Sequence, residues 1–139
     1  MREIKFRGKD CWGNWRYGDL MKNSIPTASP VIVEDFYYDD PDDSMFEVNT
    51  DTVGQFTGLR DADGREIYEG DIVKVMSYGE ESFHVVKYMI DLDYPAFDLE
   101  PAMDGDFNSL SYCMIDIDTK ITVIGNIHDN QELLRLTKK

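Results

Sequence analysis

The sequence predicts a mainly β protein with a short helix at its C-terminal end. Short runs of β-branched and aromatic residues recur along the chain, and turn residues such as Asp-Gly and Pro separate them. The one stretch with a helix-capping pattern stands close to the end. With 139 residues, of which 42% are hydrophobic, the chain is long enough for one ordinary domain or for two small β units.

The N-terminal part reads as short strands joined by loops. A turn at Gly13-Asn14 predicts a hairpin between the first two strands. Pro26 and Pro30 block regular structure before the third strand. The expected strands are residues 3–8, 15–20, 31–33 and 46–48.

The central stretch, residues 53–75, is the most sharply patterned and reads as strand, turn, short strand, turn, strand. Asp63-Gly64 favours a tight turn because glycine accepts a positive φ. We expect the charges around this turn to be exposed to water. A calcium loop counted from Asp61 would need Gly and Glu where the chain has Glu66 and Ile72, so that reading is rejected.

The C-terminal part predicts further strands at residues 82–90, 96–99, 112–117 and 121–124. In the first of these, His84 is expected to point to solvent, with no partner at metal-ligand spacing. In the third, Cys113, Ile115 and Ile117 would share one face. Asp129 and Glu132 have the spacing of a capping box at the start of the closing helix.

Several motifs resemble those of the YopX family of phage and prophage proteins. The central matches are Thr52–Leu59 and Asp61–Val73, and the chain's opening and ending add Arg2–Lys9, Trp15–Leu20, Val123–Ile127 and Glu132–Leu134. The resemblance implies an irregular N-terminal β-sheet region over residues 1–58 and a small SH3-like barrel over 59–139. It implies no biochemical activity, because the family has none established.

Charge is distributed unevenly along the chain, whose net charge is −14. Residues 1–22 carry +3, residues 23–119 carry −19 and residues 120–139 carry +2. An acidic surface repels nucleic acid, so direct nucleic-acid binding is not expected. Basic ends and an acidic middle instead favour a protein partner or a homo-oligomer whose contacts weaken with salt.

The candidate partner-binding residues are aromatic: Trp12, Trp15, Phe36, Tyr37 and Tyr38. Aromatic side chains are enriched at protein interfaces. The tryptophans stand among basic residues, which is also the composition of a single-strand nucleic-acid platform. The other three stand in a segment with six acids in ten residues, Glu34–Asp43, which is expected to be a solvated loop.

No motif for catalysis, a metal or a cofactor is present: there is no P-loop, dinucleotide-binding turn, nucleophile elbow or HExxH. The N-terminus lacks a signal-peptide pattern and no apolar run is long enough for a membrane span, so a cytoplasmic protein is expected. Cys11 and Cys113 are too far apart in sequence for a metal pair. We therefore expect a non-enzymatic phage accessory protein. The alternatives are an acidic mimic of nucleic acid that blocks a host DNA-binding protein, and a metal-dependent nuclease.

Overall fold

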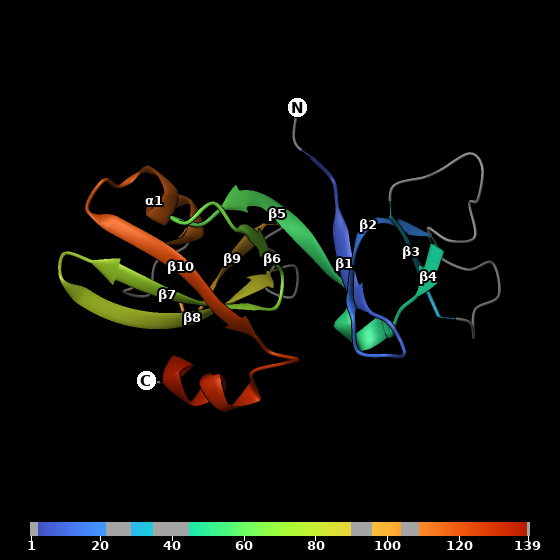
Figure 1. Ribbon diagram of the computed structural model, residues 1–139. Helices are drawn as coiled ribbons and strands as arrows, with labels where there is room; N and C mark the ends of the chain where they lie inside the picture. Colours follow the sequence, from blue (N-terminus) through green and yellow to red (C-terminus); the bar gives the residue numbers. More distant parts are fainter. Residues whose placement is uncertain (1–2, 22–28, 35–44, 90–95, 104–108, 139) are drawn as a thin grey trace. The chain divides into compact units, whose positions relative to one another are not determined.

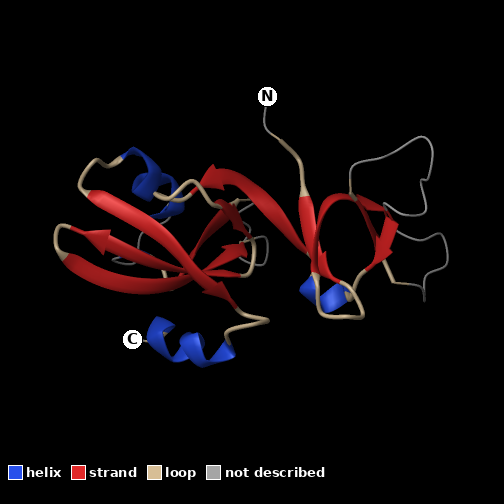
Figure 2. Cartoon of the chain, viewed as in Figure 1, coloured by secondary structure: helices blue, strands red, loops and turns tan. Residues whose placement is uncertain are grey.

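A computed structural model describes residues 3–21, 29–34, 45–89, 96–103 and 109–138 of the chain. The described chain is mainly β, as predicted, and its strands form antiparallel sheets (Figures 1 and 2). It divides into two compact units, Met1–Gly58 and Leu59–Lys139. Strand β5, Gly54–Arg60, carries the chain from one to the other. The two units are taken separately below.

Unit 1 is built from four short strands and the start of β5. The order of neighbours is β4-β3-β2-β1-β5, and each successive pair is antiparallel. A 3-10 helix, η2, follows the last short strand and leads into β5. The bounds are β1 Phe6–Lys9, β2 Trp15–Met21, β3 Val31–Val33, β4 Met45–Glu47 and η2 Thr50–Thr52.

The register of unit 1 separates a buried face from an open face. Leu20 lies opposite Ile32 and Ile32 opposite Phe46, so these side chains share one face of the sheet. Ile32 is fully buried there. On the same face the Gly8 Cα lies against Val48, and a Cβ on Gly8 would come within 2.9 Å of the Val48 side chain.

Unit 2 contains a four-stranded antiparallel sheet in the order β10-β7-β8-β9, together with the short strand β6 beside the end of β5. Helix α1 packs against β9 and β10, and the 3-10 helix η5 packs against β8. The described strands show no pairing between β10 and β9, so the SH3-like barrel stays a prediction. The bounds are β6 Glu66–Tyr68, β7 Asp71–Ser77, β8 Glu80–Tyr88, β9 Phe97–Glu100, α1 Ser109–Ile115, β10 Thr119–Asn126 and η5 Gln131–Thr137.

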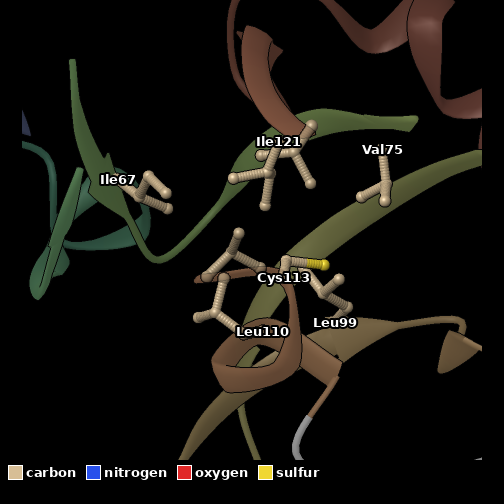
Figure 3. Close-up of a cluster of buried hydrophobic side chains, with 8 residues drawn as sticks. Ile67, Val75, Leu99, Leu110, Cys113 and Ile121 are labelled. Carbon is tan, nitrogen blue, oxygen red and sulfur yellow. The ribbon is translucent and has the colours of Figure 1, made fainter. Parts of the chain in front are cut away.

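The hydrophobic core of unit 2 lies between this sheet and α1 (Figure 3). Leu110 and Cys113 are one helical turn apart, so both point from α1 toward the strands. The strands supply β-branched and leucine side chains that meet them. The cluster consists of Ile67, Val73, Val75, Val86, Leu99, Leu110, Cys113 and Ile121.

The strand expected over residues 112–117 is wrong, because helix α1 occupies most of that segment. Only Cys113 of the three residues expected to share a face is buried; Ile115 is 80% exposed and Ile117 is 97% exposed. The buried Asp98 carboxylate of β9 accepts a hydrogen bond from the Leu110 N–H at 3.0 Å. This contact satisfies a donor in the first turn of the helix, which an extended segment would not present in that place.

The closing helix is present as η5, but the capping box is not. The residue before the helix is Asn130, and its side chain makes no capping hydrogen bond to the helix. Its amide oxygen instead accepts from the Asn126 N–H at 3.1 Å, and Asp129 accepts from the Asn126 side chain at 3.3 Å. The polar side chains here hold the preceding turn.

Two polar residues expected at the surface are buried. Asp61, in the central turn, is 6% exposed, and His84 on β8 is 2% exposed. Asp61 accepts hydrogen bonds from the backbone N–H groups of Asp63, Arg65 and Val123 at 2.9, 2.8 and 2.9 Å. The turn therefore points one carboxylate inward, while Asp63 and Arg65 remain exposed as expected.

The two cysteines are free and differ in accessibility: Cys11 is exposed and Cys113 is buried. Burial, aided by the charges of Asp98 and Asp116, raises the pKa of Cys113 to about 11. At pH 8 only about one Cys113 thiol in a thousand would be the reactive thiolate. We expect one equivalent of a maleimide to attach to Cys11 in the native protein, and a second to attach only after unfolding. Peptide mapping by mass spectrometry checks this; equal labelling of both thiols in the native protein would contradict the packing of α1.

Candidate functional site

The loop between β1 and β2 is held in one conformation by a buried carboxylate. Asp10 Oδ1 accepts from the backbone N–H groups of Trp12 and Asn14, both at 2.9 Å, and Oδ2 accepts from Arg16 Nε at 2.9 Å. The Asp10 N–H donates to the Asn14 carbonyl, which closes the loop. Gly13 has φ +82°, a conformation that glycine adopts at low cost.

These contacts also set the charge of Asp10. Burial alone would raise the pKa of this carboxyl group. The hydrogen bonds from Asn14, Arg16 and Trp12, together with the positive charge of Arg16, outweigh burial and hold the pKa of Asp10 below its usual range. Asp10 is therefore ionised at neutral pH, which keeps all its oxygen atoms available as acceptors for the loop.

The loop displays Trp12, whose side chain is 76% exposed. A tryptophan on a mobile loop would lose conformational freedom when it bound a partner, but the loop of Trp12 is already fixed by Asp10. Tryptophan is the side chain most enriched among the residues that dominate interface energies. Of the two selected aromatic residues that the structure describes, Trp12 is thus the stronger partner-binding candidate.

Trp15 is placed differently, because the sheet partly buries it. The Arg7 guanidinium lies 4.7 Å from the centre of its ring and the Lys9 ammonium lies 5.6 Å away. In the same unit Arg16 stacks over Phe46 at 3.7 Å and pairs with Asp10 and Glu34. The basic side chains are engaged within unit 1, which favours the folded-hairpin reading over a nucleic-acid platform.

The open face of unit 1 carries apolar side chains that were not among the predicted partner-binding residues. Tyr17 is 39% exposed, Met21 is 50% exposed and Met45 is 37% exposed. Met21 lies opposite Val31 and Met45 opposite Val33, so the register places these side chains on the same face. The sequence signal for this open face is the alternation of side chains between the two faces of β2. This signal can be used only when it is known which of the two faces is buried.

Phe36, Tyr37 and Tyr38 lie outside the described residues, as does most of the acidic segment around them. In the part of the chain that the structure describes, no group of three or more His, Cys, Asp or Glu residues could hold a metal ion. Within the same ranges, no helix has the length and apolar character needed to cross a membrane.

Comparisons with known proteins identify the family and a structural relative. The family model described as YopX protein matches residues 5–135. The crystal structure of protein EF1440 from Enterococcus faecalis is similar, with a TM-score of 0.58 and 26% sequence identity, over 96% of this chain and 99% of that one. Comparison with curated proteins gave no match. Because the family match spans nearly the whole chain, as the motifs at both ends and in the centre predict, this protein belongs to the YopX protein family.

Proposed function

We propose that this YopX-family protein is a non-enzymatic accessory protein of a phage or prophage, and that it acts in the host cytoplasm by binding a protein. Trp12 is the anchoring residue of the interface. The observation that carries this proposal is the combination of a largely exposed tryptophan with a loop that a buried carboxylate holds fixed.

Two further features support a protein partner. The open apolar face formed by Tyr17, Met21 and Met45 offers the mixture of aromatic and methionine side chains that interfaces favour. The Arg16 charge is paired with Asp10 and Glu34, and the net charge of −14 on the whole chain repels a phosphate backbone. An exposed aromatic anchor on an acidic chain fits a protein surface better than a nucleic acid.

A second copy of the chain is one such partner. The basic N-terminal segment and the acidic middle segment are complementary in charge. A homo-oligomer formed through them would dissociate as salt screens the charges. Sedimentation velocity of the purified protein at low and high salt tests this form of the proposal directly.

The main experiment compares the wild-type protein with Trp12→Ala. We expect the substitution to weaken binding, to a second copy or to a captured partner, by about 30-fold, the loss typical of a hot-spot tryptophan. Ile117→Ala is the matched control, because Ile117 is 97% exposed and belongs to unit 2. Neither substitution should change the free energy of unfolding by more than about 0.5 kcal/mol.

Capture from phage-infected host cells, with and without nuclease, extends the test to unknown partners. A protein that is captured stoichiometrically by wild type and by Ile117→Ala but not by Trp12→Ala supports the proposal. A DNA-binding protein that is displaced by added duplex DNA favours the acidic mimic instead. Equal capture by all three forms would show that Trp12 is not the anchor.

A further inference from the structure

The outer edge of β10 is bonded to groups that do not belong to a strand. β10 is an outer strand of the unit 2 sheet, and β7 pairs with one side of it. The Tyr78 N–H donates to the Asp118 carbonyl on that side. Backbone groups alternate between the two sides of a strand, so those of Thr119, Ile121 and Val123 point away from β7.

The central turn, residues 61–65, covers the middle of this edge. The Ala62 N–H donates to the Ile121 carbonyl at 3.0 Å. Asp61 Oδ2 accepts from the Val123 N–H at 2.9 Å, and Arg65 Nη1 donates to the Val123 carbonyl at 3.0 Å. The turn therefore occupies the hydrogen-bonding groups that a neighbouring strand would use.

The two ends of the edge are engaged by residues close to them in sequence. The Thr119 N–H donates to the Asp116 carbonyl at 3.2 Å. At the other end, the Asn130 N–H donates to the Asn126 carbonyl at 2.9 Å, and Asn130 Oδ1 accepts from the Asn126 N–H at 3.1 Å. Only the middle of the edge is covered by a distant segment, since the bond from Val123 to Asp61 spans 62 residues.

The composition of β10 makes an open edge hazardous. The strand is Thr-Lys-Ile-Thr-Val-Ile-Gly-Asn, rich in β-branched residues and with Lys120 as its charged residue. A strand of this kind with unpaired N–H and C=O groups is a template for pairing with another chain. Its partner in such a pair would need the groups of Ile121 and Val123 that the central turn now engages.

Polar contacts hold the central turn in this place. Asp61 is buried, whereas the other residues of the turn are exposed; these are Ala62, Asp63, Gly64 and Arg65. The turn therefore buries little apolar surface against β10. Its position on the edge depends on the Asp61 carboxylate and the Arg65 guanidinium.

The outer strand on the opposite side of the sheet has a comparable arrangement. Val86 accepts from the Gly70 N–H and so faces β7, which leaves Leu99, opposite Val86, with its backbone groups turned outward. Asp98 is 2% exposed, and its Oδ1 accepts from the Leu99 N–H at 2.9 Å. A buried carboxylate thus engages an outward backbone donor on each outer strand.

We propose that the central turn blocks a strand-addition surface on β10, and that the occupant it excludes is β10 of a second copy of the chain. A symmetric antiparallel pair centred on Thr122 would place Ile121 of one copy opposite Val123 of the other, and the two residues would exchange hydrogen bonds. Lys120 would lie opposite Ile124 of the second copy, so like charges would not meet.

This pairing differs from the association proposed through Trp12. It uses backbone hydrogen bonds of unit 2, so salt should not weaken it. It involves no residue of the Trp12 loop, so Trp12→Ala should leave it unchanged. Failure of either proposal can therefore be recognised without reference to the other.

The test uses a double variant, Asp61→Asn with Arg65→Ala, which frees the turn from β10. The Asn side chain keeps Oδ1, the atom that accepts from the Asp63 and Arg65 N–H groups. It places an amide NH₂ donor against the Val123 N–H, where Oδ2 accepted before. Arg65→Ala removes the donor to the Val123 carbonyl.

The control is Arg60→Ala with Asp63→Asn, which changes the charge of the chain equally at two exposed positions. Sedimentation velocity at high salt compares the variants with the wild type. We expect the dimer dissociation constant of the test variant to be at least about tenfold lower than that of the wild type or the control.

NMR of the test variant locates the contact. In a mixture of ¹³C-labelled and unlabelled chains, isotope-filtered NOEs should connect β10 of one copy with β10 of the other. The Ile121 and Val123 amides should exchange more slowly as the protein concentration rises. If the double variant does not fold, Arg65→Ala alone decides, because Arg65 is exposed; its dimer dissociation constant should be about threefold lower than that of the wild type.

The proposal is overturned if the folded variant stays as monomeric as the wild type. It is also overturned if the control associates equally, or if the dimer forms through residues outside β10. Association that disappears at high salt or in the Trp12→Ala background would likewise contradict it, since that behaviour belongs to the Trp12 interface.

Discussion

Replacing Asp61 by alanine is expected to lower the free energy of unfolding of unit 2 by about 3 kcal/mol. The carboxylate is buried and accepts three backbone hydrogen bonds. The bond from the Val123 N–H ties the central turn to β10 across 62 residues of sequence. Alanine leaves this partly buried donor without its partner, and the loss of an acceptor for a donor shielded from water costs about 1–3 kcal/mol.

Urea unfolding measures the total loss, and amide hydrogen exchange locates it. The Val123 amide should exchange faster in Asp61→Ala by at least tenfold, together with its neighbours in β10. Asp63→Ala is the matched control, since Asp63 stands in the same turn but is exposed; it should change stability by less than about 0.5 kcal/mol. If both variants lost the same stability, general turn propensity rather than the buried carboxylate would explain the effect.

Replacing Gly18 by alanine is expected to destabilise unit 1 by about 3 kcal/mol, through the pairing of β2 with β3. A Cβ on Gly18 would overlap the carbonyl oxygen of Val33 and lie 2.8 Å from its carbonyl carbon. The obstacle is backbone, which cannot move aside as a flexible side chain can. The two strands must separate at the point where Asp19 pairs with Val33.

Gly13→Ala is the control that separates the steric overlap with Val33 from the cost of placing alanine where glycine has a positive φ. Gly13 has φ +82° and its Cβ would meet nothing within 4 Å, so alanine there should cost only about 1 kcal/mol. Thermal unfolding compares the two variants. Hydrogen exchange in β2 and β3 should increase for Gly18→Ala and stay unchanged for Gly13→Ala. Similar losses in both variants would mean that backbone strain, and not the contact with Val33, dominates.

Most strands could be predicted from the sequence because their local signals agree. Val31–Val33 and Ile72–Val75 are β-branched runs bounded by turn residues, and β3 and β7 cover them. The Asp-Gly turn at Asp63-Gly64 was likewise visible locally. For these segments, local preference and the final packing require the same backbone conformation.

The wrong predictions concern segments whose structure is set by contacts with residues distant in sequence. The spacing of Cys113, Ile115 and Ile117 fits a strand, but a helix forms because Asp98 satisfies the Leu110 N–H and because Leu110 and Cys113 fill the core together. Alternation placed His84 in solvent, yet the carbonyl of Pro101, 17 residues away, accepts its proton. Contacts of this kind depend on how strands are brought together, which periodicity alone does not encode.

The candidate site was partly visible in the sequence. Trp12 could be selected from the sequence by residue type alone. The conformation of its loop depends on Asp10. Nothing in the sequence distinguishes Asp10 from the other acidic residues, of which the chain has 28 in all. The side-chain contacts of Ser77 and Ser82 could not be foreseen, because their partners are distant along the chain or are set by the strand pairing. Ser77 contacts Thr119 and Ser82 contacts His84, and only the folded sheet places these partners together.

The exposed thiol of Cys11 stands one residue before Trp12 in the same fixed loop. Indole rings quench nearby dyes such as bimane by electron transfer over short distances. A bimane attached to Cys11 would therefore be dim in the free protein and brighten when a partner covers the Trp12 ring. The fluorescence of the labelled protein would therefore report whether a partner is bound at the β1–β2 loop. It can reveal which fractions of a cell extract contain a partner before that partner has been identified.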